Sequence, residues 1–330
     1  MTANHQDNEP AESFKGKSII ITGGAGYLAS NLVSLMSQSD CRIIRMDRSD
    51  ACWENVSGTA QVIDVSCDVC DPSVWDVLEG VDYIFHFAAQ TSTYVSNASP
   101  VDDQAINVMP MLNMLEACRR LGTCPTICFS STVTISGIPE SLPVNEGHQN
   151  HPLTVYDLHK FMAEQYLRWY AEQGFVNGVT LRLANVYGPG PRSSCSDRGI
   201  LNQMVRRALE GKKLTVYGTG EYLRDYIYVE DVARAFMCAA LHSEKLNARY
   251  FVIGSGKGHS IAEAMRLIAD HAVTKTGLRV EVQHIEPPDS LSAIEQRHFV
   301  ADSRLFNEVT GWDARYSLSE GIDQTMEAFK

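Results

Sequence analysis

The segment that decides the fold reads Ser18-Ile19-Ile20-Ile21-Thr22-Gly23-Gly24-Ala25-Gly26-Tyr27-Leu28-Ala29. Residues 18–22 form an apolar run of strand length, and residues 27–37 carry the pattern of a helix. Between them, small residues at the spacing G-x-x-G-x-x-A let the backbone turn tightly and approach a pyrophosphate, which would then lie at the helix N-terminus. Because a glycine-rich turn can also be a tight turn without a ligand, its meaning depends on the segments that follow.

The second strand, expected over residues 42–46, is followed by an acidic residue about twenty positions after the glycine turn. This residue, Asp47, can accept a hydrogen bond from a ribose 2′-hydroxyl, and its charge repels a 2′-phosphate. The cofactor expected at the turn is therefore NAD rather than NADP. Arg48 comes next and weakens this preference, because an arginine can pair with a 2′-phosphate.

Strand and helix patterns alternate through the first half of the chain. Further strands are expected over residues 61–64, 82–87, 126–130 and 179–183, and helices over residues 72–78, 103–121 and 156–173. This alternation predicts right-handed βαβ units and hence an α/β fold with a doubly wound parallel sheet. The second half is less regular, with helices expected over residues 200–210, 230–241 and 261–271 and strands over residues 249–253 and 279–283.

The expected organisation is a Rossmann domain with a smaller C-terminal substrate-binding lobe. Residues 1–14 are expected to form a polar tail. The Rossmann domain takes residues 15–186 and about 226–254, and the lobe takes about 187–225 and 255–330.

The composition is that of a folded, acidic protein. Of 330 residues, 44% are apolar and 21% charged, and the formal charge is −12. This mix argues against disorder, collagen-like repeats and a coiled coil. The acidic balance argues against a nucleic-acid surface, since it repels phosphate backbones. The first fifteen residues lack the apolar core of a signal peptide, and no apolar run is long enough for a membrane span, so we expect a cytoplasmic protein.

Nine cysteines are scattered along the chain. Cys67 and Cys70 form a C-x-x-C pattern, which can indicate zinc binding or redox chemistry. No second pair or histidine follows at ligand spacing, and structural zinc usually has four ligands. We therefore expect no metal site and reduced, mostly buried thiols.

Tyr156 and Lys160 are four residues apart in a predicted helix and so share one face. A lysine ammonium beside a phenol favours the phenolate, which can exchange a proton with a substrate hydroxyl while hydride leaves the adjacent carbon. The alternative is an ordinary surface pair on an amphipathic helix. His159, between them, is expected to pack or to face solvent.

Taken in order, these motifs resemble those of the extended short-chain dehydrogenase/reductases that modify nucleotide sugars, the NAD-dependent epimerase/dehydratase group. The resemblance extends from residue 17 to residue 328. Besides the glycine turn, the matching segments are Cys67-Asp68-Val69, Phe85-His86-Phe87-Ala88-Ala89, Asn107, Phe129-Ser130-Ser131-Thr132 with Gly137, Tyr156 with Lys160, Arg182-Leu183-Ala184-Asn185-Val186-Tyr187-Gly188-Pro189, Leu214-Thr215-Val216-Tyr217-Gly218, Arg224-Asp225-Tyr226-Ile227-Tyr228-Val229 and Arg297.

The resemblance implies a role for each matched residue. The implied catalytic residues are Thr132, Tyr156 and Lys160. The implied NAD-binding residues are Gly23, Gly26, Tyr27, Leu28, Asp47, Arg48, Asp68, Val69, Phe87, Ala88, Ala89, Tyr156 and Lys160. The implied substrate-binding residues are Thr132, Asn185, Val216, Tyr217, Arg224 and Arg297. Of these, Asn185, Arg224 and Arg297 would hold the substrate diphosphate as a clamp, and Val216 and Tyr217 would belong to the nucleotide-base pocket. The predicted helices 103–121 and 156–173 resemble the pair that forms a homodimer interface in this family; packing against the sheet is their alternative role.

Several positions depart from the family pattern and narrow the expected reaction. Val133 and Thr134 stand where the family's 4,6-dehydratases carry Asp-Glu, so proton transfer at C5 and C6 is not expected. Ala29 replaces a third glycine, Ser136 replaces a tyrosine, and Ala184 replaces an aromatic residue found beside the nicotinamide in many 4-epimerases.

The resemblance therefore implies an NAD-dependent nucleotide-sugar epimerase that acts by transient oxidation, at C4 and on a UDP-sugar. A 4-ketoreductase or dehydrogenase, or a dehydratase of the same family, is the alternative. A non-catalytic sensor of NAD or nucleotide sugars is a remote alternative, since Thr132, Tyr156 and Lys160 are all retained.

Overall fold

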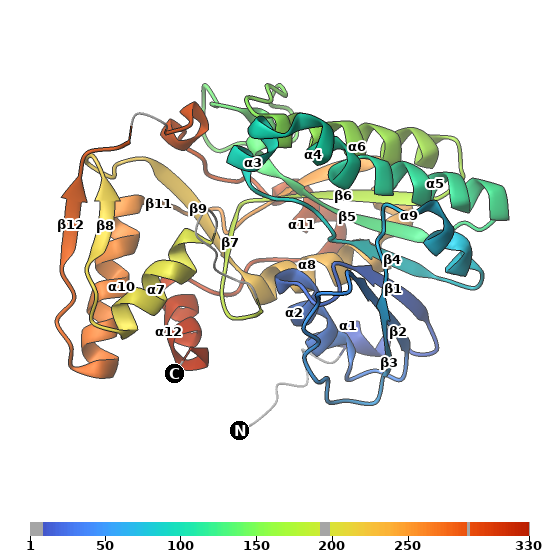
Figure 1. Ribbon diagram of the computed structural model, residues 1–330, viewed down its shortest axis with the longest axis horizontal. Coiled ribbons are helices and arrows are strands. Elements are labelled where there is room, and N and C mark those ends of the chain that lie inside the picture. Colours follow the sequence, from blue (N-terminus) through green and yellow to red (C-terminus); the bar gives the residue numbers. More distant parts are fainter. Residues whose placement is uncertain (1–8, 192–198, 289–290, 330) are drawn as a thin grey trace.

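The central feature of the computed structural model, which describes residues 9–191, 199–288 and 291–329, is a seven-stranded sheet (Figure 1). In spatial order its strands are β10 (Arg249–Ile253), β6 (Asn177–Leu183), β5 (Thr126–Thr132), β4 (Tyr83–His86), β1 (Ser18–Thr22), β2 (Arg42–Asp47) and β3 (Gln61–Ser66). Every neighbouring pair is parallel. The chain reverses its order between β1 and β4, where a sheet of this type opens a crevice for ligands. The predicted doubly wound parallel sheet is confirmed.

Helices cover both faces of this sheet (Figure 1). On one face lie α4 (Pro100–Asn107), α5 (Met109–Leu121) and α6 (Val155–Glu172), and on the other lie α2 (Tyr27–Met36) and α8 (Val229–Leu241). Each face has its own hydrophobic cluster: Met111 and Leu167 belong to one, Leu32 and Phe236 to the other. Because both faces of the sheet are covered by helices, side chains on both sides of each strand are buried, and the strands are nearly continuous hydrophobic runs.

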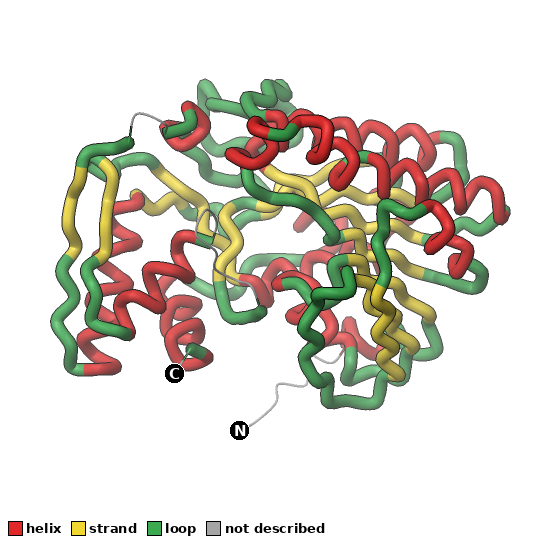
Figure 2. Tube along the Cα trace, in the orientation of Figure 1, coloured by secondary structure: helices red, strands yellow, loops and turns green. Residues whose placement is uncertain are grey.

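The small lobe packs around a third hydrophobic cluster. Its strands β8 (Leu214–Tyr217) and β12 (Val282–Ile285) are parallel and lie apart from the large sheet in Figure 2. Its helices are α7 (Ile200–Leu209), α10 (Ile261–Thr276) and α12 (Leu318–Ala328). A three-stranded sheet in the order β11 (Gly258–Ser260), β9 (Leu223–Tyr228) and β7 (Asn185–Tyr187) lies between the two parts (Figure 1).

The remaining elements are short. They are α1 (Glu9–Glu12), α3 (Thr93–Ala98), α9 (Ser243–Leu246), α11 (Arg304–Thr310) and the 3-10 helices Pro72–Leu78, Val133–Ser136 and Ala293–Gln296.

One buried carboxylate joins β9 to the segments that meet it. Asp225 is fully buried and accepts hydrogen bonds from the backbone N–H groups of Ser255, Gly256 and Ala301, at 2.7–3.0 Å. A buried carboxylate needs such partners, since an unpaired charge is costly to desolvate. Asp225 therefore fixes β9, which carries Arg224, relative to the end of β10.

Three expectations about the elements need correction. The predicted helix 103–121 is two helices, separated at Val108. Pro110 explains the break, because it lacks an N–H and its ring clashes with the carbonyl four residues earlier. The predicted strand 279–283 lies at Val282–Ile285, where it pairs with β8.

The third correction concerns residues 9–14 of the expected N-terminal tail, which belong to the folded part of the chain. Residues 1–8 lie outside the described residues, but α1 begins at Glu9 and Phe14 is fully buried against Tyr83. The tail pattern misled because a single aromatic side chain is enough to anchor a polar segment to the core.

Candidate active site

The glycine turn lies at the switch point, between β1 and α2, and has no room for side chains. Gly23 has φ +64°, and a Cβ there would lie 2.9 Å from the backbone nitrogen of Ala88. A Cβ on Gly24 would lie 2.6 Å from the Cβ of Arg45. The α2 N-cap, Gly26, has no side-chain capping bond, so the first N–H groups of the helix face the turn without a side-chain partner from the cap residue. Such a cradle fits a pyrophosphate.

The end of β4 is held against this turn by Thr22. The Thr22 hydroxyl oxygen accepts hydrogen bonds from the backbone N–H groups of Phe87 and Ala88, both at 3.1 Å. The predicted cofactor-binding stretch Phe87-Ala88-Ala89 therefore begins directly beside the glycines. Tyr27 and Leu28 begin α2, and the Tyr27 ring lies against Gly190.

Asp47 is positioned by the same turn. Its carboxylate accepts hydrogen bonds from the N–H groups of Ala25, at 3.0 Å, and Arg48, at 2.8 Å. The Arg48 side chain is exposed and lies 3.6 Å from Asp50. The structure therefore places the predicted ribose-binding carboxylate beside the pyrophosphate cradle, and Arg48 at its solvent side.

The Asp68-Val69 stretch follows along the same edge of the sheet. The N–H of Cys67 donates to the carbonyl of Asp47 at 2.8 Å, and Val69 is buried with its carbonyl accepting from the Trp75 indole. Burial raises the pKa of Cys70 to about 12, aided by Asp68, which disfavours the thiolate that redox chemistry requires. Within the described ranges, no cluster of three or more His, Cys, Asp and Glu side chains is arranged to hold a metal ion.

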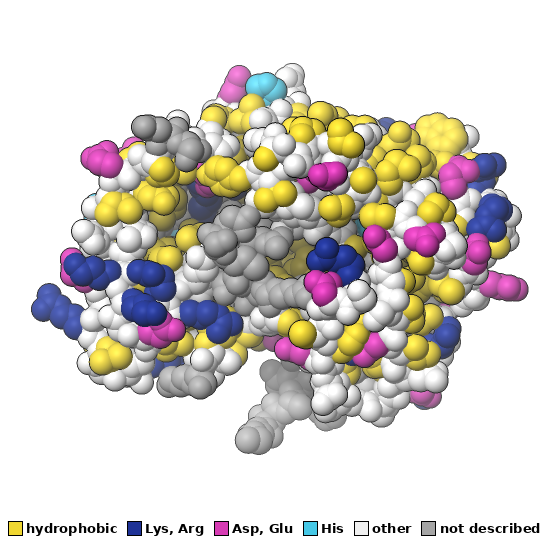
Figure 3. Space-filling model, in the orientation of Figure 1, with side chains coloured by type: hydrophobic (Ala, Val, Ile, Leu, Met, Phe, Trp, Pro, Cys, Tyr) yellow, Lys and Arg dark blue, Asp and Glu magenta, His cyan; other side chains and the backbone are white. Residues whose placement is uncertain are grey.

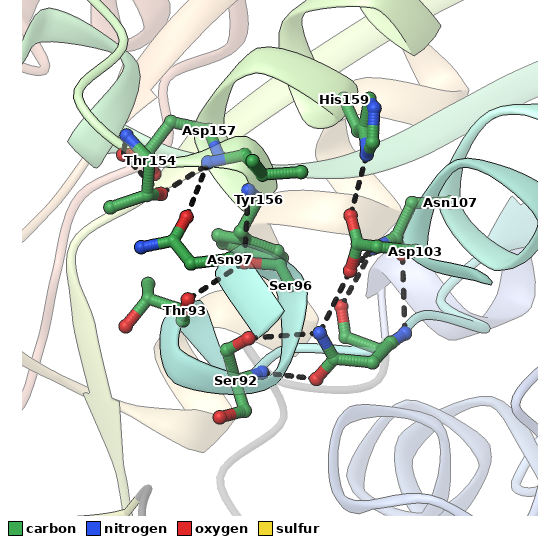
Figure 4. A network of polar contacts seen from close by, with 12 residues as sticks. Ser92, Thr93, Ser96, Asn97, Asp103, Asn107, Thr154, Tyr156, Asp157 and His159 are labelled. Atoms are coloured by element: carbon green, nitrogen blue, oxygen red, sulfur yellow. Dashed lines mark hydrogen bonds and ion pairs between the residues drawn. The ribbon is translucent and has the colours of Figure 1, made fainter. Parts of the chain in front are cut away.

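The three predicted catalytic residues lie on two adjoining elements, β5 and α6. Pairing of Thr132 with Leu183 extends β5 beyond the expected strand, so Thr132 is its last residue. Tyr156 and Lys160 lie in the first turns of α6, and the Lys160 ammonium lies 4.3 Å from the centre of the Phe129 ring on β5. The Tyr156 N–H donates to the Ser96 hydroxyl at 3.1 Å (Figure 4).

Burial sets the electrostatics of Lys160. Its desolvation lowers its pKa to about 7, although the carboxylates of Glu164 and Asp103 oppose the change. A lysine with a pKa near 7 can gain or lose a proton at ordinary pH. Desolvation likewise lowers the pKa of His86 to about 3, helped by the charge of Lys160, so that imidazole stays neutral.

A cluster of polar side chains joins α6 to α4 (Figure 4). The His159 imidazole contacts the carboxylate of Asp103 at 2.7 Å, and the other Asp103 oxygen accepts from the Gln90 and Asn107 amides. His159 is therefore buried against α4 rather than solvent-facing. The cluster ties α6 to α4 and to the segment after β4 at the level of the catalytic residues.

The proposed diphosphate clamp is buried and differs between its two arginines. The Arg224 guanidinium donates to the carbonyls of Arg297 and Glu295 and lies 3.3 Å from the Glu295 carboxylate. Arg297 donates to the Ile294 carbonyl, while its Nε has no hydrogen-bond partner among the described residues. The same holds for the buried side-chain oxygen of Asn185. Unpartnered buried polar atoms such as these two are candidate positions for a ligand contact.

Arg297 also carries the clearest electrostatic signal of the clamp. Burial lowers its pKa to about 10, and the adjacent charge of Arg224 adds to this effect, while Glu295 and Asp157 oppose it. A desolvated guanidinium of this kind is stabilised by an anionic partner. The two residues predicted for the nucleotide-base pocket lie further out, on β8: Val216 is buried in the small-lobe cluster, and Tyr217 is about half exposed.

Comparison with known proteins identifies the same family that the sequence motifs resemble. The sequence profile of the NAD dependent epimerase/dehydratase family matches residues 19–254, which is most of the chain. The chain belongs to this family. It is 29% identical over 316 residues to a putative UDP-glucose 4-epimerase of Methanocaldococcus jannaschii, covering 94% of this chain and 98% of that protein.

Two further relatives bracket the chemistry within the family. The crystal structure of the Thermotoga maritima UDP-glucose 4-epimerase with UDP-glucose is 30% identical, with a TM-score of 0.84, and covers 94% of this chain and 98% of that one. A UDP-glucuronic acid decarboxylase of Xenopus tropicalis is 27% identical over 95% of this chain and 72% of its own. Family membership therefore shows that the chain is an NAD-dependent enzyme of this fold. Because the family includes both epimerases and decarboxylases, the reaction has to be inferred from the residues of the site.

Two site residues were missed by the sequence analysis. Asp157 is fully buried beside the catalytic residues and forms a capping box with Thr154 (Figure 4). The pattern Thr154-x-x-Asp157 is a recognisable signal of such a cap. Ser96, which supports the Tyr156 backbone, lies in the unpredicted helix α3, and no local motif indicates its role.

Proposed function

We propose that this protein interconverts UDP-sugars that differ in configuration at C4, by transient oxidation at that carbon. The observation that carries the proposal is the placement of Thr132, Tyr156 and Lys160 on the adjoining elements β5 and α6, with Val133 and Thr134 directly after Thr132. Neither of these neighbours is an acid that could move protons at C5 and C6 in a dehydration. The similarity to 4-epimerases over 94% of the chain supports the same reaction.

The residues divide the work as follows. NAD bound at the glycine turn would supply the hydride acceptor for oxidation at C4 and the hydride for the reverse reduction. Tyr156 takes the proton of the C4 hydroxyl and gives it back after the sugar has turned. The Lys160 charge stabilises the Tyr156 phenolate, and Thr132 contacts the reacting oxygen.

The diphosphate has to stay fixed while the sugar turns over. Asn185 and Arg297 supply the unpartnered polar atoms for this, and Arg224 adds charge behind them.

The test is incubation of the NAD-loaded protein with UDP-glucose and identification of the sugar nucleotide by proton NMR. We expect UDP-galactose to appear without net consumption of NAD. Consumption of NADH or NADPH with a 4-keto sugar would indicate a reductase instead. Loss of carbon dioxide from UDP-glucuronic acid would indicate a decarboxylase.

The proposal extends to assembly and location. A homodimer would cover the apolar side chains on the outer surface of α5 and α6, including Leu121, Leu158 and the half-exposed Trp169. Figure 3 shows hydrophobic side chains gathered over this part of the molecule.

All eight cysteines in the described part of the chain are unpaired, which suits the reducing cytoplasm. None of the described helices has the length and apolar character of a membrane span.

A further inference from the structure

We propose that the Phe129 ring keeps the buried Lys160 side chain charged, through a cation–π contact with its ammonium group. Phe129 is then a positioning residue that acts through Lys160. The inference rests on the proposed function only for the use of this charge, which is to stabilise the Tyr156 phenolate. The contact itself does not depend on which reaction the protein catalyses.

The charged end of Lys160 lies against an aromatic face inside the protein. Its Nζ lies 4.3 Å from the centroid of the Phe129 ring. Lys160 is 2% exposed and Phe129 is 1% exposed, so water reaches neither group freely. A cation within about 6 Å of a ring centroid is attracted by the negative face of the ring, and this attraction is strongest where both groups are desolvated.

The two carboxylates that favour the charged form of Lys160 are engaged with other groups. Glu164, one turn further along α6, forms an ion pair with Arg182 at 2.6 Å. Asp103 of α4 contacts His159 at 2.7 Å and accepts from two side-chain amides. In the described part of the chain, by contrast, Lys160 is the only cation over the Phe129 ring. The ring is therefore the group most fully available to the ammonium.

The neighbouring strand holds the Phe129 ring in place. Phe129 on β5 pairs with His86 on β4, and the two rings stack with centroids 5.7 Å apart and planes at 25°. Desolvation lowers the pKa of His86 to about 3, so this neighbour is neutral and does not repel the ammonium. The other titratable groups around Lys160 are Glu164 and Tyr156 on its own helix and Asp103 on α4.

The contact matters because the charge of Lys160 is finely balanced. Desolvation lowers its pKa to about 7, whereas an aromatic face stabilises the ammonium and not the neutral amine. A group with a pKa near 7 is about half charged at neutral pH, so a change of one unit alters its charge severalfold. An aliphatic side chain at position 129 would fill the same space without this attraction.

The test weakens the negative face of the ring without changing its shape. Phe129 is replaced in the full chain by 4-fluoro-, 3,5-difluoro- and 3,4,5-trifluorophenylalanine. The pKa of Lys160 is followed by NMR of carbon-labelled lysine, with and without NAD, and Lys160→Met identifies its signal. Each fluorine should lower the pKa further, by about one unit in total for the trifluoro ring. The alkaline limb of the pH profile of turnover should move to lower pH by the same amount.

Two further variants separate the cation–π contact from packing. Phe129→Leu removes the ring and keeps an apolar side chain, so it should lower the pKa of Lys160 about as much as the trifluoro ring. Phe85 is the matched control, because it is fully buried on β4 and packs against Phe87 and Phe236 on the other face of the sheet. The trifluoro ring at that position should leave the pKa of Lys160 unchanged.

Two results would overturn the assignment of Phe129. One is a Lys160 pKa that does not fall with fluorination at Phe129, and the other is an equal fall with fluorination at Phe85. A turnover limb that stays fixed while the pKa of Lys160 moves would overturn the catalytic use of the charge. Because the NMR titration needs no turnover, these results can be separated from a failure of C4 epimerisation.

Discussion

At the residue scale, the chemistry of the site depends on the Tyr156 side chain. Replacing Tyr156 with Phe removes the proton-carrying oxygen and keeps the packing of the ring. We expect turnover to fall by about 10²-fold or more, the usual range for loss of general acid–base catalysis. NAD binding and the thermal unfolding midpoint should stay close to those of the unmodified protein. A variant that keeps more than a tenth of the turnover would assign the proton transfer to another group.

Lys160 is the residue whose burial costs the protein stability. Its pKa is about 7 when folded and near 10.5 when exposed. The folded state therefore loses stability as pH falls from about 10.5 to 7, where the unfolded chain binds the additional proton, and the loss is complete below pH 7. Lys160→Met should raise the free energy of unfolding of the cofactor-free protein by up to about 5 kcal/mol at pH 6 and by less than about 1 kcal/mol at pH 10.

The measurement for Lys160 is chemical denaturation at the two pH values, with turnover measured in parallel. Turnover should fall while stability rises. Equal stability changes at pH 6 and pH 10 would mean that the lysine charge is not responsible. The mutation would then act through packing alone.

Replacing Arg297 and replacing Arg224 should have different effects on substrate binding and on stability. Arg297→Ala removes the guanidinium with the unpartnered nitrogen, so UDP should bind roughly ten- to a hundredfold more weakly, the usual effect of losing a charge-assisted bond. Arg224→Ala also leaves the buried carbonyls of Glu295 and Arg297 without their donor, so its unfolding midpoint should fall as well. Calorimetric titration with UDP and with NAD measures the affinity of each variant for the two ligands, and thermal unfolding measures its stability. Equal loss of both ligands in Arg297→Ala would place this arginine outside the substrate site.

At the element scale, the unit of β1, glycine turn and α2 follows directly from the sequence. Its strand, its turn and the start of its helix all lie where local residues place them, because the glycines permit a backbone path that other residues cannot follow. The shift of β12 and the identity of α3 depend on partners distant in the chain. The same applies to the buried His159–Asp103 contact, which bridges 56 positions and leaves no local pattern.

The role of Asp47 at the end of β2 can be tested through the preference of the protein for NAD over NADP. NAD should bind more tightly than NADP, and Asp47→Ala should narrow the difference by about tenfold, since it removes the repulsion of a 2′-phosphate. Asp40→Ala removes an exposed charge near the other end of β2, away from the glycine turn and from Arg48, and serves as the control. Fluorescence titration with the two reduced cofactors gives both affinities. Tighter binding of NADP by the unmodified protein would show that Arg48 outweighs Asp47.

At the scale of the whole molecule, the site is assembled from both parts of the chain. The large sheet supplies the cradle and the catalytic residues, while β7, β9 and the segment around Arg297 supply the diphosphate clamp. Most candidate site residues could be named from sequence because their motifs occur in the order that the family resemblance implies; their roles stay predictions. Asp157 and the difference between the two arginines required the three-dimensional arrangement, since burial and hydrogen-bond partners are properties of the folded state.

The central claim is oxidation and return of hydride at C4, and one isotope experiment tests it most directly. UDP-glucose is converted by the unmodified, NAD-loaded protein in deuterated water, and the sugar is examined by NMR. We predict inversion at C4 with no solvent deuterium on any sugar carbon, because the same hydride returns and no neighbouring carbon loses a proton. Deuterium at C3 or C5 would show enolisation of a keto intermediate and would contradict simple C4 epimerisation.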